Sequence, residues 1–115
     1  MKFKRKDQRI DIKLSSSVRE INANKRSFCI ATNVSRNGIF LTTKVDLFLG
    51  MSVECIIAFN DQSIMFRGEV RRVFEEQPGT KGYGIEIIEI SEEKAKILEE
   101  FIEAGYLPEL ENQQQ

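Results

Sequence analysis

Apolar and polar residues alternate along most of the chain between residues 10 and 90. This is the period of a β-strand with one buried face. The first stretch, IDIKL, places Ile10, Ile12 and Leu14 on one face, and the alternation returns at residues 18–21 after three serines. Five later stretches have strand character: residues 27–35, 38–43, 51–59, 64–76 and 83–90. Turn signals (NANK, SRNG, NDQS and QPGTKG) separate several of them.

Short strands with tight turns between them predict an antiparallel sheet that closes into a small barrel. A chain of 115 residues forms one domain that can bury a core without disulfides or a metal ion. We therefore expect a mainly β fold, a six-stranded antiparallel β-barrel within residues 10–107.

The hydrophobic period changes to that of a helix after residue 90. In SEEKAKILEEFIEAG, Ala95, Leu98 and Ile102 share one face. Ser91 suits the N-cap and Gly105 suits the C-terminal stop. We expect an amphipathic helix over about 91–104 that packs on the barrel. Residues 1–9 are expected to form a flexible basic segment, and residues 108–115 a polar tail.

Composition argues against an enzyme. The chain contains no histidine, which removes Ser–His and Cys–His nucleophiles and the commonest metal ligand. Cys29 and Cys55 lie in apolar runs and are expected to be reduced, buried thiols. The glycine-rich GTKGYG lies between two strands and opens no helix, so it does not fit a P-loop. We expect no catalytic residues, no cofactor and no metal.

Charge is unevenly distributed. Residues 1–13 hold six Lys or Arg against two Asp, whereas residues 86–115 hold nine Glu against two Lys. This asymmetry favours an anionic partner for the N-terminal end rather than nucleic acid over the whole surface. No apolar run approaches the roughly 20 residues that span a bilayer, and no signal-peptide pattern is present. We expect a cytoplasmic protein that does not insert into membranes.

NVSRNG, at residues 33–38, combines polar side chains with a turn. Asn33 and Ser35 project from the same strand face, and Gly38 offers the backbone freedom of a tight hairpin. An amide and a hydroxyl side by side can read the edge of guanine. The alternative is a plain hairpin, with Asn and Gly present for turn geometry. Arg36 is expected on the other strand face, mostly solvated, with a supplementary ligand contact as its second role.

RKDQR places Arg5 and Arg9 four residues apart near the N-terminus. The guanidinium fork fits phosphate oxygens or a guanine edge, and its plane stacks on purines. Beside a base-edge reader, two arginines predict a site for a guanine nucleotide that carries phosphate. Lys4 and Lys6 would add long-range attraction that salt screens. The alternative is a solvated basic tail.

These two motifs, RxxxR and then [D/N]xSxxG with 23 residues between them, resemble the signature of the PilZ domain family. FRGEVRRVFEE, GYGIEI and the closing helix are similar to the end of that domain, so the resemblance covers about residues 5–105. It implies that the ligand is cyclic di-GMP. Arg5 and Arg9 would grip phosphate and guanine, Asn33 and Ser35 would meet a guanine edge, and Gly38 would hold the turn. The family accepts Asn at position 33, although Asn lacks a carboxylate, which should weaken the contact modestly.

The resemblance implies a non-enzymatic signalling adaptor. Its N-terminal segment would order over cyclic di-GMP and change a surface that an unidentified protein effector senses, in the control of motility or exopolysaccharide. Either a monomer or a homodimer is compatible with this scheme.

Two alternatives stay open: a PilZ-fold interaction module that binds no ligand, and a small barrel that binds single-stranded nucleic acid. The latter requires exposed aromatic residues on a basic face. The sequence argues against it, because six phenylalanines fall mostly in apolar stretches and are expected in the core: Phe28, Phe40, Phe48, Phe59, Phe66 and Phe74. Arg67, Arg71 and Arg72 are expected to be surface charges, one of which can reach the ligand from a neighbouring strand.

Overall fold

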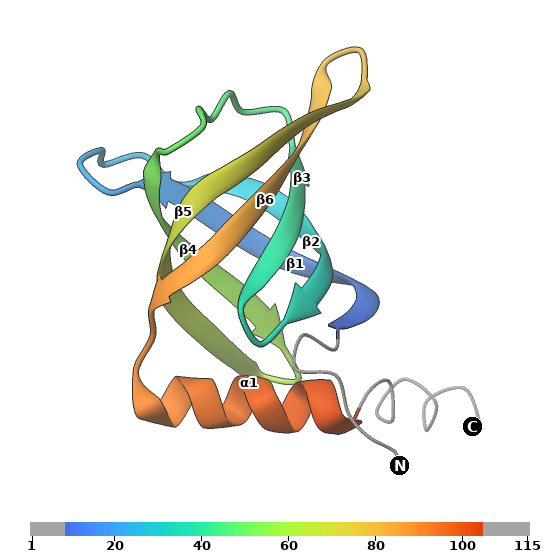
Figure 1. Ribbon diagram of the computed structural model, residues 1–115, viewed down its shortest axis with the longest axis vertical. Coiled ribbons are helices and arrows are strands. Elements are labelled where there is room, and N and C mark those ends of the chain that lie inside the picture. Colours follow the sequence, from blue (N-terminus) through green and yellow to red (C-terminus); the bar gives the residue numbers. More distant parts are fainter. Residues whose placement is uncertain (1–8, 105–115) are drawn as a thin grey trace.

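The computed structural model describes residues 9–104 of the chain, which form a β-barrel with one helix (Figure 1). The elements are β1 Arg9–Glu20, β2 Ser27–Ser35, β3 Gly38–Thr43, β4 Ser52–Phe59, β5 Gln62–Gln77, β6 Thr80–Glu89 and α1 Glu92–Ala104. The barrel is closed in the order β1-β2-β3-β6-β5-β4, and every pairing between neighbours is antiparallel. The predicted six-stranded antiparallel barrel with a C-terminal helix is confirmed.

The strand pattern in the sequence corresponds closely to the observed strands. β2 and β3 have the predicted bounds, and β4, β5 and β6 differ from theirs by one to three residues at an end. β1 runs without a break through the three serines. Ser16 faces the interior there, and its hydroxyl donates to the Leu14 carbonyl at 3.0 Å. A buried polar group is thereby satisfied, so the strand continues.

The interior of the barrel is filled by the inward side chains of all six strands. The largest fully buried side chains include Val18, Leu41, Ile57, Ile64 and Tyr83. The Tyr83 hydroxyl donates to the Val45 carbonyl at 2.9 Å and accepts from the Leu47 amide at 3.0 Å. This phenol therefore fastens the β3–β4 loop to the barrel wall.

Both cysteines are free and buried, as predicted. Burial raises the pKa of the Cys29 thiol to about 12, although the nearby Arg26 charge acts in the opposite direction. Burial also raises the pKa of the Cys55 thiol. Both thiols are protonated at neutral pH and behave as small apolar side chains.

Helix α1 covers one end of the barrel (Figure 1). Leu98 and Ile102 are buried, and the Phe101 ring lies 4.2 Å from that of Phe59, centroid to centroid. The predicted N-cap is confirmed, because the Ser91 hydroxyl accepts from the Lys94 amide at 3.1 Å. The predicted stop at Gly105 lies outside the described residues. Within residues 9–104 no helix has the length and apolarity to cross a membrane.

The expectation that six phenylalanines lie in the core is wrong for half of them. Phe66 is buried, and Phe40 and Phe59 are half-buried. Phe28, Phe48 and Phe74 are 66%, 65% and 41% exposed. Phe28 is on the outer face of β2, next to the buried Cys29, and Phe48 is in the β3–β4 loop. An apolar neighbourhood in the sequence therefore does not fix which face of a strand a side chain occupies.

Gly38, the first residue of β3, allows β3 to lie close to β6. A Cβ atom built at Gly38 would lie 2.4 Å from the Ile85 carbonyl oxygen, which is backbone and cannot move aside cheaply. The positive-φ glycines in the described part are Gly50 and Gly79. The sequence singled out Gly38 for the backbone freedom of a tight hairpin, whereas the structure shows close packing between strands and no positive φ at this residue.

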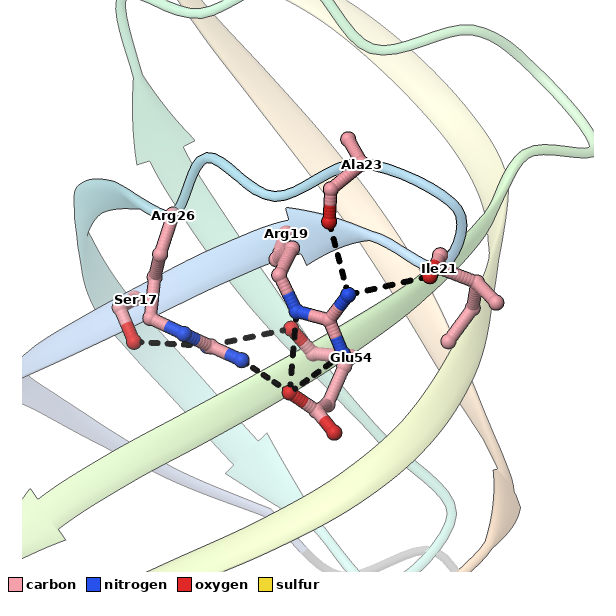
Figure 2. Close-up of polar contacts among 6 residues, drawn as sticks. All are labelled: Ser17, Arg19, Ile21, Ala23, Arg26 and Glu54. Atoms are coloured by element: carbon pink, nitrogen blue, oxygen red, sulfur yellow. Dashed lines mark hydrogen bonds and ion pairs between the residues drawn. The ribbon is translucent and has the colours of Figure 1, made fainter.

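The β1–β2 turn is fastened by Arg19, Arg26 and Glu54 (Figure 2). Both guanidinium groups contact Glu54 Oε1, Arg19 at 3.1 Å. Arg19 also donates to the Ile21 and Ala23 carbonyls at 3.0 and 2.8 Å, which holds the turn against the side of the barrel. The three side chains are only 24–27% exposed.

Replacing Glu54 with alanine should lower the free energy of unfolding by about 2 kcal/mol, because two half-buried guanidinium groups lose their shared counter-charge. Urea denaturation measures this change. The matched control is Glu89→Ala, which breaks the exposed Arg67–Glu89 pair and should cost less than about 1 kcal/mol. Equal losses of unfolding free energy in the two variants would show that the contacts of Glu54 with Arg19 and Arg26 stabilise the fold no more than an exposed ion pair does.

Replacing Gly38 with alanine should destabilise the barrel by about 2–3 kcal/mol, because the new methyl group meets the Ile85 carbonyl. Gly84→Ala is the control, since the atoms nearest to its Cβ would be those of the Arg72 side chain, at 3.4 Å or more. Thermal unfolding should give a clearly lower melting temperature for Gly38→Ala alone. A similar melting temperature for both variants would contradict this account of Gly38.

Candidate functional site

The β2–β3 hairpin presents the second motif on the outer wall of the barrel. Val34 is fully buried, so its neighbours Asn33 and Ser35 face outward together, as the sequence predicted. The Ser35 hydroxyl accepts from the Gly38 amide and donates to the Gly38 carbonyl, both at 3.2 Å. Ser35 therefore has a structural role in closing the hairpin, and its oxygen retains one acceptor position for a ligand.

Asn33 is paired across the sheet with Asp11 of β1. The two residues are direct partners in the β1–β2 register, and Asn33 Nδ2 donates to Asp11 Oδ1 at 3.1 Å. Both strands have register irregularities here, between Asp11 and Leu14 and between Ala31 and Asn33. Bulges of this kind redirect side chains and often lie beside binding sites.

A groove of about 530 Å³ runs along the outer wall at this point, and we call it the outer groove. Its volume is within the range typical of small-molecule sites. Asn33, Ser35 and Gly38 line it together with Asp11, and the opposite wall comes from β5 and β6. Three of the five predicted principal site residues are therefore brought together.

The structure also locates the remaining predicted residues. Arg9 is the first residue of β1, and its Cα partner is Ser35, so the RxxxR motif leads directly to the hairpin. The Arg9 side chain and residues Arg5, Lys4 and Lys6 lie outside the described part. Arg36 is not among the lining residues: it is 54% exposed and pairs with Glu99 of α1 at 3.5 Å.

Two arginines of β5 line the outer groove. A register irregularity between Val70 and Arg72 lets two consecutive residues, Arg71 and Arg72, both point outward. The sequence treated them as equivalent to Arg67, which is outside the groove and pairs with Glu89. No sequence signal marked the bulge that separates these roles.

Arg71 and Arg72 differ in their partners. Arg71 Nε donates to Glu86 Oε1 at 2.6 Å, and this bond, with the nearby Glu69 charge, raises the Arg71 pKa above its ordinary value. Arg72 has no ion-pair partner among the described side chains. Gly84 lies beside the aliphatic part of Arg72, where a larger residue would make contact. Of the two described cations that line the outer groove, Arg72 is therefore the better placed to meet an incoming anion.

An aromatic pair completes the lining of the outer groove. The Phe40 and Phe74 rings lie 5.5 Å apart, centroid to centroid, at an interplanar angle of 52°. With the arginines, they give the groove flat apolar surfaces beside cations, which suits a planar anionic ligand. Within residues 9–104, no group of His, Cys, Asp or Glu side chains is arranged to hold a metal ion.

Comparisons with known proteins relate this geometry to other structures. The Bacillus subtilis inhibitor of motility MotI/DgrA is similar, with a TM-score of 0.73, 18% identity, and coverage of 98% of this chain and 54% of that one. The PilZ domain of Escherichia coli YcgR, solved with c-di-GMP, has a TM-score of 0.75, 12% identity, and coverage of 98% and 99%. The PilZ domain of CeSA from a cellulose-synthesizing bacterium has a TM-score of 0.60, 12% identity, and coverage of 82% and 93%.

The TM-scores show a shared fold, and this chain spans about half the length of MotI/DgrA. A comparison with curated proteins found no match. The model of the family described as "PilZ domain" matches residues 3–104. Domains of this family typically bind cyclic di-GMP and are generally non-enzymatic. Because the match covers nearly the whole chain and the barrel has the same fold, this chain belongs to the PilZ domain family.

Proposed function

We propose that this chain binds cyclic di-GMP in the outer groove and acts as a non-enzymatic signalling adaptor. The observation that carries the proposal is the placement of Asn33, Ser35 and Gly38 along one groove, with Arg9 opposite Ser35. The YcgR domain, which shares this fold, was solved with c-di-GMP. In this proposal, Asn33 and Ser35 contact the edge of a guanine base. Gly38 lets β3 and β6 lie close together beneath that contact.

The charge balance of the outer groove indicates a role for the N-terminal arginines, Arg5 and Arg9. Among its described residues the outer groove holds two cations, Arg71 and Arg72, against two carboxylates, Asp11 and Glu86. Because these positive and negative charges balance, the groove does not by itself attract a dianion. Arg5 and Arg9 would supply the positive surplus, and their planar forks would grip phosphate and guanine. Lys4 and Lys6 would add attraction at long range only.

The proposed output is a change of surface. When Arg5 and Arg9 engage the ligand, residues 1–9 take a defined position over the outer groove, and an effector protein can distinguish this surface from the free one. Cyclic di-GMP is a bacterial second messenger, so the proposal includes a cytoplasmic location and a role in the control of motility or exopolysaccharide.

Isothermal titration calorimetry with cyclic di-GMP tests the site. Replacing Arg5 or Arg9 with alanine should cost at least about 2–3 kcal/mol of binding free energy, because each variant removes charge-assisted hydrogen bonds. Arg67→Ala is the matched control, since Arg67 is an exposed arginine outside the groove. It should bind like the unmodified chain.

Three outcomes of these titrations would contradict the proposal, each in a different way. Unchanged affinity in both the Arg5 and the Arg9 variant would reject the phosphate grip. If cyclic di-GMP does not bind to the unmodified chain, the result would support a PilZ-fold interaction module that binds no ligand. If GTP or GMP binds with the same affinity as cyclic di-GMP, the groove does not distinguish the cyclic dinucleotide from other guanine nucleotides.

Binding of single-stranded nucleic acid is a second candidate, and one observation favours it. Phe74 is exposed beside Arg71 and Arg72, which is the combination of aromatic and cation that such sites use. Asp11 and Glu86 in the same groove oppose a polyanion. Competition decides between the candidates: cyclic di-GMP should remain bound in the presence of excess oligonucleotide, and displacement would favour nucleic acid.

A further inference from the structure

We propose that Asp11 supplies the carboxylate that reads guanine, and that Asn33 is the residue that positions it. This inference rests on the proposed function, because it names a specificity-determining residue of the same groove. Neither sequence motif includes Asp11.

Asp11 and Asn33 are direct cross-strand partners, which brings their side chains together on one face of the sheet. Asn33 Nδ2 donates to Asp11 Oδ1 at 3.1 Å, and both residues line the outer groove. The amide therefore holds the carboxylate at the groove surface. Asp11 Oδ2 makes no hydrogen bond to any other described side chain.

Guanine requires hydrogen-bond acceptors along its Watson–Crick edge. Its Watson–Crick edge presents two adjacent donors, N1–H and the exocyclic N2–H. A carboxylate accepts both with full negative charge, whereas a carboxamide has a single acceptor oxygen. Asn33 alone is therefore a poor acceptor for this edge. Asp11, one strand away, provides the missing anionic oxygens.

The other carboxylate of the groove is already occupied. Glu86 accepts from Arg71 at 2.6 Å, so its charge is neutralised. Asp11 forms no ion pair with any described side chain. An amide at position 33 is also the compatible partner, because a carboxylate there would face Asp11 and repel it.

Three variants test the assignment: Asp11→Asn, Asn33→Asp and the double exchange that carries both. Each is titrated with cyclic di-GMP and with cyclic di-IMP, whose hypoxanthine bases lack the exocyclic amino group. Asp11→Asn should weaken cyclic di-GMP binding by about tenfold or more and reduce the preference over cyclic di-IMP. Asn33→Asp should bind no better than the unmodified chain, despite its added carboxylate. The double exchange should recover both affinity and preference, because it restores one carboxylate and one amide.

The preference between the two ligands is the decisive readout, since a merely structural role would not change it. Thermal unfolding of each variant identifies any loss of affinity that comes from a damaged fold. If the unmodified chain binds and Asp11→Asn keeps the same affinity and preference, the inference is wrong and the proposed function stands. If the unmodified chain does not bind cyclic di-GMP, the proposed function fails, and the role of Asp11 fails with it.

Discussion

The pairing of β3 with β6 is the constraint on which the rest of the structure depends. These strands are distant in sequence, and their pairing closes the barrel. Close approach requires that nothing project from residue 38 toward the Ile85 carbonyl, and glycine alone meets this condition. The same contact brings the β5–β6 wall beside the β2–β3 hairpin (Figure 1). The outer groove lies between these two parts, so one steric requirement closes the fold and also forms the groove of the candidate site.

Much of the fold could be predicted from the sequence, because burial on alternate residues is a local property of a strand. The bounds of β2 and β3 and the Ser91 cap were correct. Two errors have one physical origin: neither the exposure of Phe74 nor the reason for Gly38 can be known without the neighbouring strand. Both depend on contacts between residues far apart in the chain.

For the candidate site, the sequence indicated one wall clearly and the other only in general terms: it allowed one of Arg67, Arg71 and Arg72 to reach the ligand without saying which. Asn33 and Ser35 belong to a short motif, so their shared face could be read directly. Arg71, Arg72 and Asp11 reach the groove through register irregularities and cross-strand pairing, which leave no local signal. The roles of Arg5 and Arg9 rest on the motif alone, since only the backbone of Arg9 belongs to the described residues.

The filled interior has a consequence for how such a domain diversifies. Inward residues from all strands, with Leu98 and Ile102 of α1, occupy the centre, and the groove residues Asp11, Asn33 and Arg72 face away from it. Exposed side chains of the outer wall such as Asp11 and Arg72 therefore carry little of the folding free energy, since exposed substitutions usually change it by less than about 0.5 kcal/mol. Under the proposed function, base preference can therefore be changed at such exposed positions while the scaffold stays intact, so recognition and foldability are separately adjustable.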